Sequence, residues 1–236
     1  MVLKEIIQRI QSLYSKGVQS RDSRLSSRHI YNKLLTVRTR LLSEESNKKQ
    51  KISNWNYQTL SCVELIKVPL HECICIPSNG CEVLRSKYKI PKPLTGMNNH
   101  IISNVYSIDG SIKYSEVSIL EKKYSKGNKY TKFKPDYYIQ NGYLYITQSL
   151  RGPKIISVEG LFEDPVTARL FEQYCENDCD ECNNCVSPMD LDFPIDSDRI
   201  DIIVEFAVKE LIQAFNTLGK EDITSNSVDD GKQERQ

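Results

Sequence analysis

The residues best suited to chemistry are four cysteines gathered in one short stretch of the chain. They are spaced as C-x3-C-x2-C-x2-C, at Cys175, Cys179, Cys182 and Cys185. Each C-x2-C pair forms a turn that directs both sulfur atoms inward, so the four thiolates could hold a zinc ion tetrahedrally. The tight spacing is also found in iron–sulfur sites, and a loop of free thiols or disulfides is the third alternative. Structural zinc is therefore a candidate, and no other cofactor is implied.

The other four cysteines lie around His71, at Cys62, Cys73, Cys75 and Cys81. These residues could form a second metal site. Cys73 and Cys75 alternate with isoleucines in a predicted strand, however, so we prefer to interpret them as small buried side chains. The N-terminus mixes charges into an amphipathic pattern and lacks the apolar core of a signal peptide, which indicates a reducing compartment. In such a compartment the eight cysteines are expected as thiols or metal ligands.

The motifs of common catalytic sites are missing from the sequence. Its three histidines do not follow a metalloprotease spacing, and it has neither a Gly-x4-Gly-Lys-Ser/Thr phosphate loop nor a GxGxxG motif. The GxSxG turn of serine hydrolases is also absent. The acids of FPIDSDRID suit a helix start better than a metal-dependent hydrolase. The sequence therefore predicts a protein that is not an enzyme.

A basic segment with interleaved aromatic residues lies between two predicted hairpins. Its lysines are Lys122, Lys123, Lys126, Lys129, Lys132 and Lys134. Cations beside stacking rings are typical of surfaces that bind single-stranded nucleic acid or a phosphate backbone. A solvated hairpin extension that docks on an acidic neighbour is equally consistent with the pattern.

The C-terminal part of the chain contains a long amphipathic helix. Pro194 sets an entry turn, and Asp196 or Ser197 can cap the helix start. Apolar residues then recur at helical spacing over about four turns. The candidate interface on this helix consists of Ile200, Ile203, Val204, Val208, Leu211, Ile212 and Phe215. These residues could pack within their own chain or against another copy, and Gly219 is the expected end of the helix.

Two more amphipathic helices are predicted in the first quarter of the chain. The first carries leucines and isoleucines on one face and ends at Gly17. Ser26 or Ser27 can cap the second, whose cations, Arg38 among them, lie mostly off its apolar stripe. Neither helix can bury its apolar face alone. They are therefore expected to pack with each other and with the C-terminal helix.

From Trp55 to Phe162 the pattern changes to short strands. Asp109-Gly110 and Asn141-Gly142 lie between alternating runs and predict two-residue hairpin turns. Several strands joined by short turns favour an antiparallel sheet over a parallel nucleotide-binding sheet. We therefore expect an α+β fold. In it the N- and C-terminal amphipathic helices pack as a helical bundle, and an antiparallel, hairpin-rich β section forms an insertion.

The expected domain boundaries follow from these changes of pattern. Residues 1–54 form the N-terminal helices, and residues 55–164 form the antiparallel β section. Residues 165–219 contain the cysteine loop and the C-terminal helix, which make one unit with 1–54, and residues 220–236 form a flexible tail. No apolar run approaches about eighteen residues, so no membrane segment is predicted.

Positive and negative charges are concentrated in different halves of the chain. Residues 1–150 carry 24 Lys and Arg against 11 Asp and Glu, whereas residues 151–236 carry 8 against 20. The basic half could contact nucleic acid, or it could meet the acidic half of the next copy in a head-to-tail ring. The two halves could also pack together within one subunit.

Four segments of the chain, taken in order, carry a resemblance. They are RLSSRHIYNKLLTVRTRLL, GYLYIT, IISVEGLFEDP and, after the cysteine loop, DFPI with its helix. In this order they resemble virion proteins of crAss-like tailed bacteriophages. The resemblance implies a head-to-tail connector of a short-tailed phage, a homo-oligomeric ring of about twelve copies. It also implies contacts with the portal protein, with other tail ring proteins and, transiently, with passing DNA, in a virion assembled in the host cytoplasm.

Two hypotheses about function follow from the sequence. The leading one is a structural ring subunit that joins the portal to the tail and lets DNA pass, with large subunit interfaces. The alternative is a nucleic-acid-binding protein with a small cysteine metal knuckle, which would use the basic segment and bind single strands at low salt.

Overall fold

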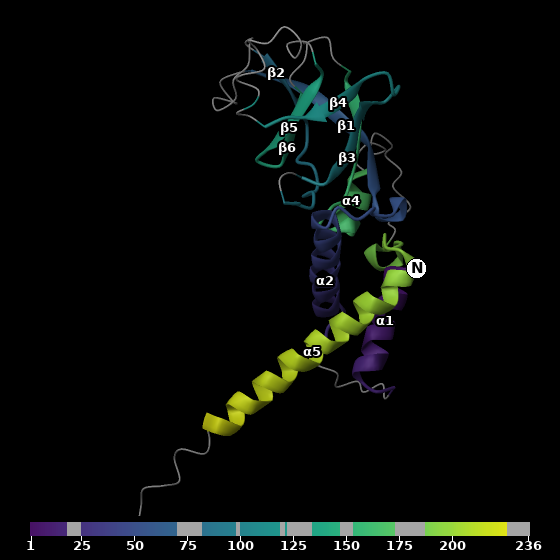
Figure 1. Cartoon of the computed structure of the whole chain (residues 1–236), viewed down its shortest axis with the longest axis vertical. Coiled ribbons are helices and arrows are strands. Elements are labelled where there is room, and N and C mark those ends of the chain that lie inside the picture. The colour runs from purple at the N-terminus through teal and green to yellow at the C-terminus, as the bar shows by residue number, and fades with distance from the viewer. Residues whose placement is uncertain are drawn as a thin grey trace, which may run out of the picture. The chain divides into compact units, whose positions relative to one another are not determined.

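The computed structural model describes residues 1–17, 25–69, 82–97, 100–118, 121, 134–146, 153–172 and 187–225, with side chains of the last helix described as far as Ala214. The chain divides into two compact units. The helical unit comprises Met1–Leu41 and Met189–Gln236, and the barrel unit comprises Leu42–Pro188. Both units are drawn in Figure 1.

Three α-helices form the described part of the helical unit. They are α1 (Leu3–Tyr14), α2 (Ser27–Asn47, which continues into the barrel unit) and α5 (Ser197–Ser225), preceded by the short 3-10 helix η4 (Pro188–Asp190). The Gly17 N–H donates to the Ser12 carbonyl at 2.9 Å and the glycine takes a φ of +82°, which ends α1 as predicted. The Ser26 hydroxyl accepts a hydrogen bond from the His29 N–H at 3.2 Å and caps α2.

The core of the helical unit contains the apolar faces of all three helices. Its buried members include Leu3, Ile6, Ile7, Ile10, Ile30, Leu34, Val37, Phe193, Ile200, Ile203, Val204, Ala207 and Leu211. The two ends of the unit are joined through the backbone. The Leu3 N–H donates to the Leu191 carbonyl, and the Phe193 N–H donates to the Met1 carbonyl, both at 3.0 Å. The start of α1 is thereby fixed beside the segment that leads into α5.

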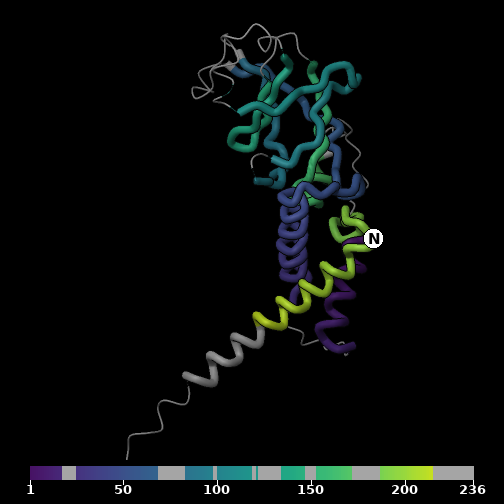
Figure 2. Tube along the Cα trace, in the orientation of Figure 1, coloured from purple at the N-terminus to yellow at the C-terminus, as the bar shows by residue number. Residues whose placement is uncertain are grey.

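The barrel unit contains a closed sheet of seven strands. They are β1 (Gln58–Pro69), β2 (Glu82–Ser86), β3 (Ile102–Ser107), β4 (Lys113–Glu116), β5 (Asp136–Gln140), β6 (Tyr143–Ile146) and β7 (Ile155–Gly160), and the 3-10 helix η1 (Asn54–Asn56) precedes them. Around the barrel the order is β1-β2-β6-β5-β4-β3-β7, and β7 pairs with β1. Figure 2 traces this course along the backbone.

Closure of the barrel depends on β1, which is long enough to pair with two different strands. Its first half pairs with β7, where Gln58 lies opposite Gly160, and its second half pairs with β2, where Leu65 lies opposite Ser86. The register with β7 shifts between Leu60 and Val63. Such an irregularity bends a strand and increases its twist, which lets one strand serve both edges of a closing sheet.

The two predicted hairpin connections are both present in the barrel, but only one of them is the two-residue turn that was predicted. Asn141 and Gly142 form the two-residue turn predicted between β5 and β6, with φ angles of +54° and +81°. The connection from β3 to β4 is longer than predicted and spans residues 108–112. There the Asp109 carboxylate accepts hydrogen bonds from the hydroxyls of Ser107 and Ser111, which lower the pKa of the carboxyl group.

One short helix completes the barrel core. In α4 (Pro165–Glu172) the Asp164 carboxylate accepts a hydrogen bond from the Val166 N–H at 2.9 Å, which caps the helix predicted after Asp164-Pro165. The core residues of the barrel are Leu60, Val63, Leu65, Leu84, Ile90, Val105, Tyr114, Tyr137, Leu144, Ile146, Ile156, Val158 and Phe162, joined by Ala168 and Phe171 of α4. The barrel therefore has a packed interior of its own.

The predicted fold class was wrong. The structure has a closed seven-stranded barrel, whereas the sequence predicted a helical bundle with a hairpin-rich insertion. One pair of strands, β4 with β5, is also parallel in a sheet predicted to be antiparallel throughout. The turn signals specify only neighbouring strands, whereas closure comes from pairings between β1 and β7 and between β2 and β6, which are distant in the sequence.

Candidate assembly surface

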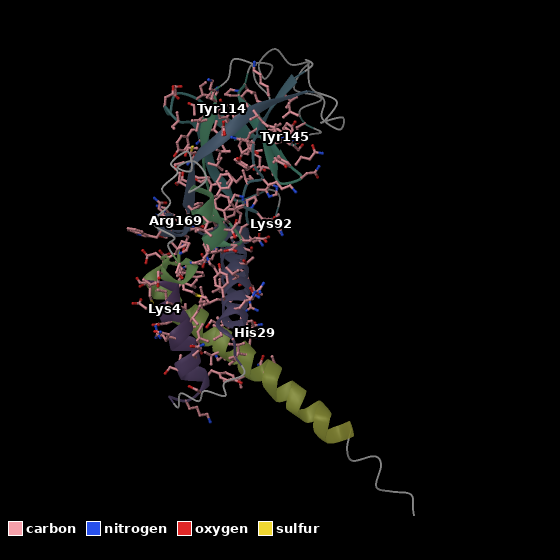
Figure 3. All side chains as sticks on the ribbon, turned by 180° about the vertical axis from the view of Figure 1, so that it is seen from behind. Lys4, His29, Lys92, Tyr114, Tyr145 and Arg169 are labelled. Atoms are coloured by element: carbon pink, nitrogen blue, oxygen red, sulfur yellow. The ribbon has the colours of Figure 1, made fainter. Side chains whose placement is uncertain are left out.

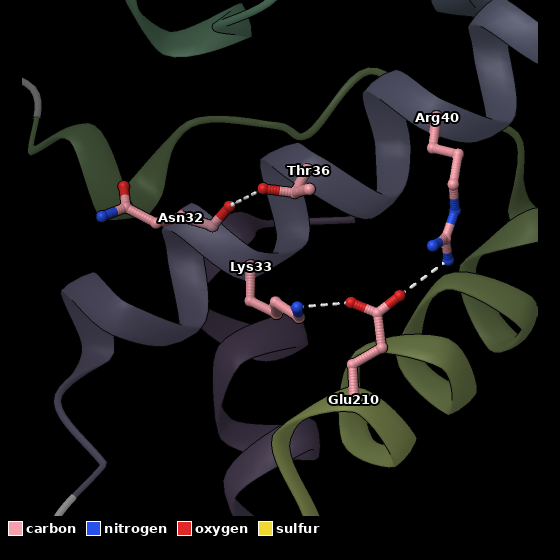
Figure 4. Close-up of polar contacts among 5 residues, drawn as sticks. All are labelled: Asn32, Lys33, Thr36, Arg40 and Glu210. Atoms are coloured by element: carbon pink, nitrogen blue, oxygen red, sulfur yellow. Dashed lines mark hydrogen bonds and ion pairs between the residues drawn. The ribbon is translucent and has the colours of Figure 1, made fainter. Parts of the chain in front are cut away.

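The clearest electrostatic feature of the helical unit is a carboxylate held between two cations. Glu210 of α5 forms ion pairs with Lys33 and with Arg40, both on α2, and the Arg40 Nη2 lies 2.8 Å from its Oε1 (Figure 4). Hydrogen bonds from Lys33 and from Arg40 hold the pKa of Glu210 below its ordinary value, against the desolvation that would raise it. The two cations therefore fix the crossing of α2 and α5.

Further ion pairs join the basic first part of the chain to its acidic last part. Arg9 of α1 pairs with Asp201 of α5 at 2.7 Å, and the N-terminal ammonium lies 3.6 Å from Asp192. Together with the Glu210 pairs, these contacts place part of the charge separation inside one subunit. The sequence left open that the basic and acidic halves pack together within one chain. These ion pairs show that such packing accounts for part of the charge asymmetry.

The stabilising effect of Glu210 should disappear on acidification. A carboxyl whose pKa is lowered in the folded state stabilises that state above its unfolded pKa, and the effect is lost as the pH falls through the folded pKa. We expect Glu210→Gln to cost about 0.5–1 kcal/mol of unfolding free energy at pH 7 and almost nothing at a pH below the lowered pKa of the folded state. Hydrogen exchange of α2 and α5 peptides at both pH values measures this difference, with Glu205→Gln, an exposed carboxylate of α5, as the control. An equal cost at both pH values would contradict the assignment.

A fully buried arginine lies on the opposite side of α2. The Arg38 guanidinium lies 5.7 Å from the ring centroid of Phe193, and its Nε donates to the Pro194 carbonyl at 3.4 Å. The prediction that this cation lies off the apolar stripe is wrong. A signal was present, because Arg38 lies four residues from both Leu34 and Leu42, which are buried.

The predicted interface residues of α5 have different environments. Four of them, Ile200, Ile203, Val204 and Leu211, are at most 8% exposed and pack inside the helical unit. Val208 is half-buried, Ile212 is 41% exposed, and the Phe215 side chain lies outside the described atoms. The buried members are therefore occupied by contacts within their own unit.

Other apolar residues of α5 face outward and are not among the predicted interface residues. Ile202 is 44% exposed and Phe206 is 40% exposed. Phe206 lies between two cations, with the Arg40 guanidinium 5.7 Å and the Lys209 Nζ 6.0 Å from its ring centroid. Ile202 and Phe206 lie four residues apart on the outer side of α5, and Ile212, six residues beyond Phe206, lies at the edge of that side. The sequence contained a signal for this surface, because Ile202 and Phe206 are large apolar residues at positions that do not follow the helical spacing of the buried residues.

The barrel unit carries a smaller cluster of cations and rings around β2 and the Asn141-Gly142 turn. The Arg85 guanidinium lies 4.4 Å from the ring centroid of Tyr143, and the Lys89 Nζ lies 5.8 Å from the same centroid. Lys87 forms an ion pair with Glu64 at 2.6 Å. Because one of the three cations is neutralised by its own chain, the net positive charge of this patch is small.

The comparison with known proteins decides the family. A family model described as phage tail ring protein 2 matches residues 5–231. The chain belongs to this family. The resemblance noted in the sequence is thereby confirmed, and the chain is a structural component of a phage tail. No curated protein sequence matches the chain.

Two predicted sites of the tail ring protein lie outside the described residues. Cys175, Cys179, Cys182 and Cys185 form the first, and Lys122, Lys123, Lys126, Lys129 and Lys132 belong to the second. Lys134, the last lysine of the basic segment, is described and is exposed. Both the metal site and the basic contact loop therefore stay predictions.

The described part of the tail ring protein adds three facts about its chemistry. Cys62 is disulfide-bonded, contrary to the expectation that the cysteines are thiols or metal ligands. Among the described residues, no group of three or more His, Cys, Asp or Glu side chains is placed to hold a metal ion. No helix in the described ranges has the length and apolar character needed to cross a membrane.

Proposed function

We propose that this tail ring protein is a head-to-tail connector, an adaptor that joins the portal to the tail and forms part of the DNA passage. The observation that carries the proposal is the family match over residues 5–231, which extends across both units. Because the match extends over both units, it supports a role in the ring for the helical unit and for the barrel unit.

The proposed assembly is a homo-oligomeric ring of about twelve copies with closed cyclic symmetry. Its partners are the portal protein and other ring proteins of the tail, and DNA contacts the ring in transit during ejection. The protein takes its place in the virion after assembly in the host cytoplasm. Its role is mechanical and geometric, and it does not depend on catalysis.

The native mass of the particle tests this proposal. One chain has a mass of 27.2 kDa, so a ring of about twelve copies should appear near 330 kDa in mass photometry. The purified protein is measured alone and with its portal, because the portal can template a ring that is weak by itself. A ring in either sample is the expected result. A 27.2 kDa monomer that persists in the presence of the portal would contradict the connector function.

A further inference from the structure

We propose that the outer side of α5 binds α2 of the next copy in the ring. The α5 strip consists of Ile202, Glu205, Phe206, Lys209 and Ile212. This inference rests on the proposed ring function and goes beyond it, because it names the surfaces that meet. The occupant of the strip is a second copy of this chain.

The α5 strip combines exposed apolar area with an ion pair. Ile202, Phe206 and Ile212 are each 40–44% exposed. Between them, the Lys209 Nζ lies 2.6 Å from the Glu205 Oε1, and both side chains are more than 60% exposed. Exposed apolar side chains interspersed with a few charged groups are compatible with a subunit interface, which as a whole is only slightly more apolar than the rest of a protein surface. Among the described contacts of the helical unit, the Arg40 guanidinium reaches one side of the Phe206 ring, and that side chain still keeps 40% of its surface exposed.

Ring symmetry determines what kind of surface must receive the strip. In a ring closed by rotation, each copy contacts its neighbour through two different surfaces, one at each side. The strip therefore needs a complementary surface elsewhere on the same chain. The α2 helix offers one, because Lys33 and Arg40 on one side of it contact α5 of their own chain, whereas other residues of α2 face outward.

The outer face of α2 offers the α5 strip one exposed cation and one half-buried leucine. It carries Arg28, Asn32, Leu35 and Thr39, at spacings of three, four and seven residues. Arg28 is exposed and has no acidic partner among the described residues, and Leu35 is half-buried. Arg28 of one copy would meet the acidic side of the strip at Glu205, and Leu35 would pack near Phe206. The exposed lysine of α1 labelled in Figure 3, Lys4, lies on a different helix and serves as a control cation.

The apolar part of the strip is tested by a double variant. Ile202→Ser with Phe206→Ser should raise the protein concentration needed for ring formation, measured by mass photometry with the portal present, by about a hundredfold or more. Both side chains are exposed, so circular dichroism should be unchanged. The matched control is Ile108→Ser, at the exposed turn between β3 and β4, which should form rings normally.

The choice of α2 as the receiving surface is tested by a charge exchange. Glu205→Lys should weaken ring formation about tenfold, and adding Arg28→Glu to the same chain should restore it, whereas adding Lys4→Glu should not. Rings from the wild type together with normal rings from the double serine variant would overturn the inference and leave the connector function intact. Failure of Arg28→Glu to restore assembly would overturn the assignment to α2. Absence of rings from the wild type with its portal would remove both proposals.

Discussion

Replacing Phe162 with alanine should lower the free energy of unfolding of the barrel unit by about 3–5 kcal/mol. The Phe162 side chain is completely buried in the barrel core. The backbone on both sides of it is held to other segments. Phe162 bridges to Pro93, and the Leu161 N–H donates to the Ile101 carbonyl at 3.0 Å. Because these contacts prevent the chain from collapsing into the cavity, most of the cost should remain unrelieved.

Hydrogen exchange of peptides from β1 and β7, measured by mass spectrometry, reports this loss in the barrel unit itself. The matched control is Phe162→Leu, which keeps most of the apolar volume and should cost about 1 kcal/mol. An alanine variant that exchanges as slowly as the leucine variant would show that Phe162 does not fill the core.

Much of the local structure could be predicted because local chemistry specifies it. Gly17 ends α1 by adopting a positive φ, Ser26 caps α2 with its hydroxyl, and Asp164 caps α4 before a proline. The Asn141-Gly142 turn likewise follows from two residues that tolerate positive φ. Each of these features depends on residues within a few positions of one another, so the sequence contains the whole cause.

The closed barrel could not be predicted because its causes are distant. Leu60 of β1 pairs with Val158 of β7, at the other end of the β section, and Leu84 of β2 pairs with Ile146 of β6. No turn residue specifies these partners. They are selected by the burial of a common interior, in which alternate residues of all seven strands meet. When each turn is interpreted separately as a hairpin, the predicted β section stays open and no barrel is predicted.

The interface predicted from the sequence and the α5 strip proposed for ring contact lie on the same helix but share only Ile212. Helical periodicity identifies the residues that bury together, and Ile203, Val204 and Leu211 indeed pack within their own unit. A surface that binds another copy must remain exposed in the single chain. It is therefore formed by apolar residues that break the periodicity, such as Ile202 and Phe206.

Replacing Arg38 with alanine should lower the free energy of unfolding of the helical unit by about 2–4 kcal/mol. The variant removes a large side chain that is 0% exposed, together with its contact to the Phe193 ring. It also leaves the Pro194 carbonyl without the hydrogen bond from the Arg38 Nε. Pro194 lies immediately before α5, so the loss should loosen the entry into that helix. Faster hydrogen exchange in α5 peptides would report it.

Arg38→Met separates the packing contribution from the charge. Methionine retains much of the apolar stem that lies against Phe193 and avoids the cost of burying a cation, so it should recover at least half of the stability lost in alanine. A methionine variant as unstable as alanine would instead assign the effect to the guanidinium and its hydrogen bonds. Because α2 and α5 carry the two surfaces proposed to meet in the ring, the alanine variant should also assemble poorly, and the methionine variant should assemble better in proportion to its recovered stability.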